Sequence, residues 1–244
     1  MTKPKLILSD IDGTLLTDAA EILPATVTGV KQAVAQGATM VLASARSPKG
    51  MFGLAQQLGI TSTMIAYNGA LTAKMTATSL TVLEERPIAS AVAAKVEQLV
   101  RENWPQASFN IYAANQWLVR ELGPWEQQEA AGIGYQPEVV VPATWLAKPT
   151  QAISAYRSKP TYLEIVATGV SKAAALETLI ADEQISPAQA IAFGDNFNDL
   201  DLLKLVGIGV AMGNAPAAVK QGANLVTTDN NHNGIQQVLA QYFE

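Results

Sequence analysis

The sequence contains no cysteine and a single histidine, His232. Without cysteine there is neither a disulfide framework nor a thiolate nucleophile, and nothing indicates an oxidising compartment. A catalytic triad or a phosphohistidine would have to use His232, which lies in a polar turn near the C-terminus, where we expect a structural or surface role. Carboxylates must therefore carry most of any acid–base chemistry.

Long apolar runs and an excess of positive charge are also lacking. No stretch reaches the roughly 20 apolar residues of a membrane span, and the N-terminal MTKPK leads into LILSD without an apolar signal core. The formal net charge of -5 argues against nucleic-acid or anionic-membrane partners, which bind basic surfaces. We expect a cytoplasmic protein that is a monomer or a weak dimer. A small phosphorylated partner is compatible with the negative net charge, because a few local cations suffice to bind a phosphate.

Short apolar runs alternate with helical patterns at both ends of the chain. Residues 5–9, 39–43 and 63–67 are apolar runs typical of buried parallel strands, separated by helical patterns over 24–36 and 48–58. The same alternation returns after residue 170, with strands expected at 190–193, 208–212 and 225–227 and helices at 171–183, 198–205, 215–221 and 234–243. This order predicts an α/β, Rossmann-like, doubly wound parallel sheet covered by helices on both faces.

The middle of the chain departs from this alternation. All four tryptophans (Trp104, Trp117, Trp125 and Trp145) fall there, among short strand patterns over 109–112, 117–120 and 139–141. We expect an inserted α+β domain over residues 85–164, between core segments 1–84 and 165–244. The tryptophans are expected to fill its core, because aromatic residues more often pack inside than line pockets.

Two carboxylates, Asp10 and Asp12, leave the end of the first predicted strand, followed by Gly13 at a sharp turn. In open α/β sheets, sites form beyond the carboxyl ends of the strands. Acids this close repel one another, and a cation between them is the simple remedy. The alternative is a strand end whose solvated acids cap a turn.

Two further segments place polar groups at comparable positions. Ser44, followed by Ala45, ends the 39–43 strand, where its hydroxyl and nearby N–H groups could bind a phosphate oxygen. The alternative, which Ser44 taken alone favours, is an ordinary loop serine or helix cap. Lys172 follows Ser171, a good N-cap, and so lies at the positive end of a helix dipole. The lysine charge there is slightly unfavourable, because it faces the positive end of the dipole, and a bound phosphate would make the position favourable. The alternative is a solvated surface lysine.

The fourth segment, Gly194–Asp199, follows the 190–193 strand. Asp195 lies at the strand tip, and Asn198 and Asp199 follow three and four residues later. Oxygen ligands of this kind suit Mg²⁺, although an Asp/Asn-rich turn that caps a helix is the alternative. The joint occurrence of all four segments at one sheet edge favours a site over four unrelated turns.

The four motifs, DIDGT, a serine, a lysine and GDNFND, occur in the order that marks the haloacid dehalogenase superfamily, which this sequence resembles. It is most similar to the Cof-type subfamily, whose class IIB cap is inserted between the second and third motifs. The segments NGA (68–70), GVSK (169–172) and GVAMGN (209–214) also have counterparts there. The sequence ASAR (43–46) stands where relatives often have ATGR, which keeps the hydroxyl but places Ala45 where glycine is common, and the cap is short.

The resemblance implies a Mg²⁺-dependent phosphatase that acts on small phosphorylated metabolites, sugar phosphates above all, through an aspartyl-phosphate intermediate. It implies that Asp10 is the nucleophile and that Asp12 is the general acid and base. It implies that the metal ligands are Asp10, Asp195 and the backbone carbonyl of Asp12. The phosphate-binding residues would be Ser44, Ala45, Lys172 and Asn198, and Asp199 would support Lys172 or a metal-bound water. Arg46 is either a salt-bridge strut or a substrate contact. Arg120, Trp117 and Tyr156 are candidate substrate contacts of the cap.

Individual features of the sequence suggest three other functions. A phosphotransferase or phosphomutase on the same scaffold would pass the phosphoryl group to a sugar hydroxyl instead of water. A receiver-type signalling module also combines acids, a hydroxyl and a lysine on a parallel sheet, but it is much shorter and has no inserted cap. Gly207, Gly209 and Gly213 do not have the spacing of a dinucleotide-binding turn.

Overall fold

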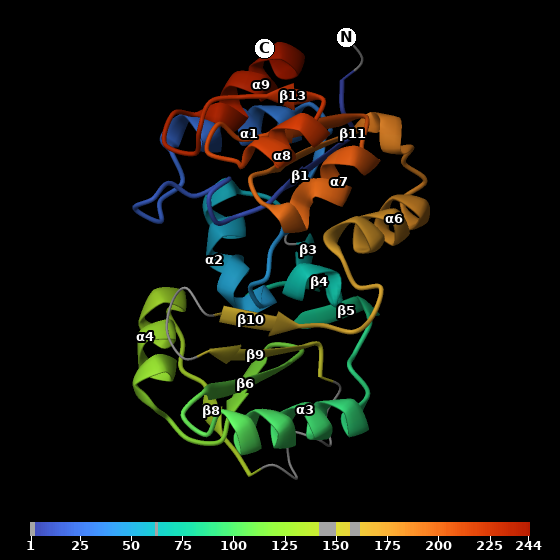
Figure 1. Ribbon diagram of the computed structural model, residues 1–244. Helices are drawn as coiled ribbons and strands as arrows, with labels where there is room; N and C mark the ends of the chain where they lie inside the picture. Colours follow the sequence, from blue (N-terminus) through green and yellow to red (C-terminus); the bar gives the residue numbers. More distant parts are fainter. Residues whose placement is uncertain (1–2, 62, 142–149, 157–161) are drawn as a thin grey trace.

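The protein, described by a computed structural model over residues 3–61, 63–141, 150–156 and 162–244, contains two β-sheets (Figure 1). The larger sheet has the strand order β13-β12-β11-β1-β2-β3-β4-β5. Its strands are β1 (Leu6–Ser9), β2 (Thr39–Ala43), β3 (Thr63–Ala66), β4 (Leu71–Met75), β5 (Leu80–Glu85), β11 (Ala190–Gly194), β12 (Ile208–Ala211) and β13 (Leu225–Val226). The six strands from β13 to β3 are parallel.

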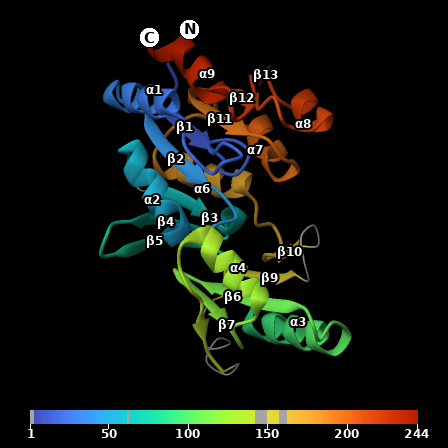
Figure 2. The same cartoon turned by 90° about the vertical axis from the view of Figure 1, so that its left-hand side faces the viewer.

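Apolar side chains alternate between the two faces of this sheet. Ile7 of β1 belongs to one apolar cluster and its neighbours Leu6 and Leu8 to another. Helices α1 (Pro24–Ala35), α2 (Pro48–Leu58) and α9 (Gly234–Phe243) cover the first face, and α6 (Lys172–Asp182), α7 (Leu200–Leu205) and α8 (Ala217–Gly222) cover the second. The predicted doubly wound α/β core is therefore confirmed, with α1 and α9 side by side in Figures 1 and 2.

The sequence patterns did not predict the β4–β5 hairpin, which extends this sheet in the antiparallel sense. Its strands are joined by a tight turn in which the Thr76 N–H donates to the Ser79 carbonyl at 2.8 Å. Strand β5 forms the sheet edge, and most of its residues are exposed. Such an edge strand lacks the continuous apolar run by which the buried strands were recognised.

The second sheet lies apart from the first and has the order β10-β9-β6-β7-β8 (Figure 1). It consists of β6 (Ser108–Ala113), β7 (Gln116–Val119), β8 (Glu138–Val139), β9 (Ala152–Tyr156) and β10 (Tyr162–Ile165), with helices α3 (Ser90–Asn103) and α4 (Pro124–Ile133). Trp117 is 1% exposed in its core, as expected for a packing residue, whereas Trp104 is 52% exposed, so the expectation that the tryptophans fill this core is wrong for Trp104. Trp145 lies outside the described residues. None of the helices over the described ranges is long and apolar enough to cross a membrane.

Direct contacts join the two sheets near the carboxyl ends of β2 and β3. The Tyr67 hydroxyl donates to the Ala114 carbonyl at 2.8 Å, and the Lys49 N–H donates to Asn115 Oδ1 at 2.7 Å. Ser47, the N-cap of α2, exchanges a hydrogen bond of 2.6 Å with the Tyr135 hydroxyl. The unit built on the second sheet thus stands over the edge where the polar motifs were expected.

Candidate active site

Three carboxylates converge where β1 and β11 end side by side. Because Ser9 pairs with Phe193 across these parallel strands, the residues that follow leave the sheet together. One oxygen each of Asp10, Asp195 and Asp199 lies within 4.8 Å of the others. Two segments more than 180 residues apart in sequence therefore meet in one acidic cluster, as their positions at strand ends predicted.

Lys172 is buried at the centre of this cluster. Its Nζ lies 2.5 Å from Asp10 Oδ1 and 2.6 Å from Asp199 Oδ1. Ser171 caps α6 by accepting the Ala174 N–H at 3.1 Å, which places Lys172 at the first position of the helix. The alternative of a solvated surface lysine is wrong, because the side chain is fully buried.

The backbone around the fourth motif is tied to Asp199. Its second oxygen, Oδ2, accepts the N–H groups of Asp195 at 3.1 Å and Asn196 at 3.0 Å. Asp199 thus holds Lys172 with one oxygen and the Asp195 turn with the other. Of the two supporting roles considered for Asp199, the structure shows the contact with Lys172.

Asp195 is held by two residues that sequence reasoning did not single out. The Thr14 hydroxyl donates to Asp195 Oδ1 at 2.9 Å, and Asn214 Nδ2 lies 3.3 Å from Asp195 Oδ2. Gly13, with a φ of +80°, leaves the space for this arrangement, because a Cβ there would lie 2.4 Å from Asp195 Oδ2. Thr14 lies within the DIDGT motif and Asn214 within the GVAMGN segment. Both segments were therefore recognised from the sequence, but these two residues were given no role.

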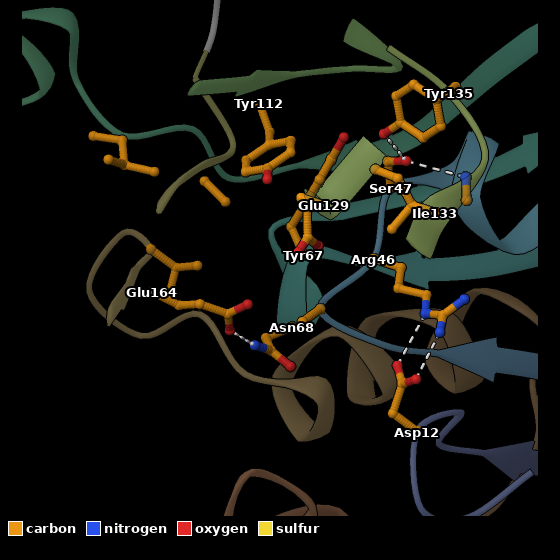
Figure 3. Close-up of a pocket in the computed structure, with 15 residues that line it drawn as sticks. Asp12, Arg46, Ser47, Tyr67, Asn68, Tyr112, Glu129, Ile133, Tyr135 and Glu164 are labelled. Atoms are coloured by element: carbon orange, nitrogen blue, oxygen red, sulfur yellow. Dashed lines mark hydrogen bonds and ion pairs between the residues drawn. The ribbon is translucent and has the colours of Figure 1, made fainter. Parts of the chain in front are cut away.

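Asp12 and Arg46 form a forked ion pair beside the cluster (Figure 3). Arg46 Nε lies 2.9 Å from Asp12 Oδ2, and Arg46 Nη2 lies 2.6 Å from Asp12 Oδ1. The Asp12 side chain is 61% exposed and lines a cleft, in contrast to the buried Asp10. Arg46 thus pairs with Asp12 in this structure, and it also lines the same cleft.

Ser44 and Asn198 flank the acidic cluster on separate loops. Ser44 is buried and its Oγ accepts the Arg46 N–H at 3.2 Å, while Ala45 lines the cleft. Asn198 donates from Nδ2 to Asn68 Oδ1 at 3.1 Å. All four motifs thus lie at one end of the sheet.

Comparison with known proteins decides the family. The sequence profile of the haloacid dehalogenase-like hydrolases matches residues 7–138 and 142–239. The chain belongs to the haloacid dehalogenase-like hydrolases. The predicted resemblance is confirmed, and the chain is a phosphatase of this family.

Relatives and solved structures of this family match over nearly the whole chain. A Haemophilus influenzae protein named "Putative phosphatase" is 31% identical, over 98% of this chain and 98% of its own length. The pyridoxal phosphate phosphatase of Escherichia coli is 26% identical, over 96% of this chain and 97% of its own. The crystal structure of a haloacid dehalogenase-like hydrolase from Bacteroides thetaiotaomicron superposes with a TM-score of 0.88 at 27% identity, covering 99% of this chain and 100% of that chain.

Burial and mutual repulsion make Asp10 and Asp195 hard to ionise. Desolvation by burial is the main cause that raises the pKa of Asp10 from 3.8 to about 7, and the charges of Asp199 and Asp195 add to it. Burial also raises the pKa of Asp195, against the hydrogen bond from Thr14. Burial would lower the pKa of Lys172, but the carboxylates of Asp10 and Asp199 outweigh it, so its pKa is raised and the amine keeps its proton.

This charge distribution fits a divalent cation. Three carboxylates lie near a single ammonium group, that of Lys172, which contacts two of them, and this leaves an excess of negative charge in a largely buried site. Hard divalent cations take carboxylate oxygens as ligands, and their charge would offset the burial and the repulsion that together raise the pKa of Asp10. The described residues therefore fit the metal-binding chemistry of the family, with Asp10 and Asp195 as the available carboxylates.

A cleft of about 330 Å³ opens beside Asp12, between the two units (Figure 3). Residues from the second sheet and its helix α4 form one wall, among them Tyr112, Glu129, Ile133, Tyr135 and Glu164. Of the three cap residues considered from sequence, Trp117 and Arg120 are not among the described residues that line it. Trp117 lies in the core, Arg120 pairs with Glu97 at 2.5 Å, and the side chain of Tyr156 lies outside the described residues.

Proposed function

We propose that this hydrolase is a Mg²⁺-dependent phosphatase of small phosphorylated metabolites, sugar phosphates above all, that works through an aspartyl phosphate on Asp10. The observation that carries the proposal is the buried contact of Lys172 with Asp10 and Asp199 beside Asp195. An ammonium group held next to a carboxylate nucleophile supplies the positive charge that an incoming phosphoryl group requires. We further propose the unit over residues 85–164 as the cap.

In the proposed reaction, Asp10 attacks phosphorus in line and the bond from phosphorus to the ester oxygen breaks. Asp12 donates a proton to the departing oxygen, which leaves as an alcohol. Asp12 then accepts a proton from the water that attacks the acyl phosphate, so that inorganic phosphate leaves and Asp10 is regenerated. Covalent catalysis divides one difficult hydrolysis into two easier steps.

The surrounding residues hold the phosphoryl oxygens and the metal. Lys172, Ser44, Asn198 and the backbone at Ala45 would contact the oxygens, and Asp199 would keep Lys172 in place. Asp10, Asp195 and the backbone carbonyl of Asp12 would hold Mg²⁺. When bound, the cation would supply charge neutralisation between the carboxylate and the phosphate.

The cleft supports a neutral, hydroxyl-bearing leaving group. Glu129 and Glu164 present carboxylates, and the Ser47 and Tyr135 hydroxyls lie on the same cleft. The carboxylates of Glu129 and Glu164 on this cleft would repel a second anionic group of the substrate, and the Arg46 guanidinium on the same cleft is already paired with Asp12. Sugar hydroxyls can instead donate hydrogen bonds to these acids.

A panel of phosphorylated metabolites, assayed for inorganic phosphate release with Mg²⁺ and with EDTA, tests this function. We expect sugar phosphates and pyridoxal phosphate to be hydrolysed only with the metal, and phosphoglycolate and bisphosphates to be poor substrates. Phosphate release also separates hydrolysis from transfer, which would yield a phosphorylated acceptor instead. Full activity in EDTA would contradict the proposed metal dependence, and absence of phosphate release from every compound would contradict the proposed substrate class.

The stabilisation of the fold by Mg²⁺ is expected to depend on pH. Because the pKa of Asp10 is raised from 3.8 to about 7, the folded protein holds a proton between these values that the unfolded chain has lost. The free energy of unfolding without metal therefore falls as the pH rises through this window, and stays lower above it. Mg²⁺ replaces the proton, so it should raise the melting temperature more at about pH 8 than at about pH 6.

Thermal unfolding in EDTA and in saturating MgCl₂ at both pH values measures this difference. Asp195→Asn, which removes a proposed ligand, should diminish the Mg²⁺-induced shift at each pH. Equal shifts at the two pH values in the unmodified protein would contradict the assigned competition between proton and metal.

A further inference from the structure

The turn of Tyr67, Asn68 and Gly69 has an unusual backbone. All three residues have positive φ angles, of 51°, 53° and 105°. For the two residues with a side chain this conformation is uncommon, and costs on the order of 1 kcal/mol or more each. Local strain of this kind is retained where surrounding contacts require it, so the contacts of this turn indicate its purpose.

The backbone of the turn touches two loops of the proposed active site. The Asn68 N–H donates to the Ser44 carbonyl at 3.0 Å. A Cβ on Gly69 would lie 2.2 Å from the Ser171 carbonyl oxygen, so the turn is in close contact with the start of the helix that carries Lys172. The turn is therefore fixed relative to both loops.

The Asn68 side chain bridges the Gly194–Asp199 segment and the second sheet. Its Oδ1 accepts a hydrogen bond from Asn198 Nδ2 at 3.1 Å, and its Nδ2 donates to Glu164 Oε2 of β10 at 2.7 Å. Figure 3 shows the Asn68 and Glu164 side chains pointing toward each other at the cleft. Three side chains from three segments thus form one continuous chain of hydrogen bonds.

This chain of hydrogen bonds has a defined direction. The Glu164 carboxylate can only accept, which fixes the Asn68 amide with its nitrogen toward Glu164 and its oxygen toward Asn198. Asn198 must then turn its own nitrogen toward Asn68, and an amide nitrogen carries two hydrogens. The second hydrogen stays available for another acceptor, such as a phosphoryl oxygen.

We propose that Asn68 is a positioning residue that orients the Asn198 amide for the phosphoryl group and links this orientation to Glu164 of the cap. The inference rests on the proposed function, in which Asn198 contacts the phosphoryl oxygens. Asn68 acts through Asn198 and touches no reacting atom. The strained turn is explained by its simultaneous contacts with Ser44, Ser171 and Asn198.

Asn68→Gly tests the positioning role, because glycine removes the amide while keeping the left-handed backbone without strain. We expect kcat to fall about 10- to 100-fold with KM changed little, since misplacing a group at the site costs mainly rate. Asn233→Gly is the matched control: Asn233 has a φ of 58° and begins α9, so this change should leave activity unaltered. A kcat of Asn68→Gly equal to that of the unmodified enzyme would overturn the proposal.

A double-mutant cycle with Asn198→Ala separates positioning from a general structural effect. If Asn68 acts through Asn198, the double variant should be no slower than Asn198→Ala alone, because coupled residues are not additive. Fully additive losses in kcat would refute the link. If the unmodified enzyme releases no phosphate, the proposed function fails; if it is active and slowed by Asn198→Ala but not by Asn68→Gly, only the positioning role fails.

The link to the cap is tested at Glu164. Glu164→Leu removes the acceptor and should lower kcat, and Glu164→Gln, whose amide oxygen can accept from Asn68, should recover most of that loss. Combining Glu164→Leu with Asn68→Gly should add little to the effect of Asn68→Gly alone. A leucine variant with undiminished kcat would show that Glu164 does not orient Asn68.

Discussion

Replacing Asp10 with asparagine is expected to abolish phosphate release, with kcat lower by about 10⁴-fold or more. The two side chains have nearly the same shape, but an amide oxygen cannot form the acyl phosphate. The fold should persist, because the pKa of Asp10 is raised mainly by burial and a neutral group removes that cost. Steady-state assays of phosphate release and thermal unfolding measure the two effects separately.

Asp18→Asn is the matched control for this change. Asp18 is an acid outside the cluster whose carboxylate contacts Asn230 at 3.0 Å and Asn231 at 3.1 Å. Its replacement should leave turnover unaltered while changing the net charge by the same amount. Normal turnover by Asp10→Asn would refute the assignment of Asp10 as nucleophile.

The second large effect is expected for Lys172→Met, on both stability and activity. Methionine fills similar space but leaves the carboxylates of Asp10 and Asp199 buried without their shared cation. Removing one partner of a buried ion pair lowers the free energy of unfolding by about 3–5 kcal/mol. Loss of a charge aimed at the transferring group should lower kcat by about 10²- to 10³-fold.

Urea unfolding without metal and kcat in saturating Mg²⁺ measure these losses. Lys95→Met, at an exposed position of α3, is the control and should change neither quantity appreciably. Because kcat is measured per folded molecule, the two readouts are independent. A Lys172→Met variant with unchanged stability would contradict the buried contact, and one with unchanged kcat would contradict the role of the lysine at the phosphoryl group.

Local sequence patterns were sufficient for the buried strands and for most helices of the core. The predicted strand Thr39–Ala43 coincides with β2, because a continuous apolar run is a local signal. The predicted helix Pro48–Leu58 coincides with α2, because it begins at a proline and ends before a glycine. The β4–β5 hairpin escaped prediction, because its stability comes from pairing with β3 and not from its own pattern. The sequence could not show whether Arg46 pairs with Asp12 or contacts the substrate, since an arginine side chain suits both roles.

The amino-acid sequence by itself determined the α/β class, the family, and which carboxylates and cations stand at the strand ends, because motif spacing and hydrophobic period are properties of short segments. Only the tertiary structure decided that Lys172 is buried between Asp10 and Asp199, that Thr14 and Asn214 hold Asp195, and that Asn68 joins Asn198 to Glu164. These contacts join residues far apart in the chain. Their geometry follows from strand order and packing, which no single segment encodes.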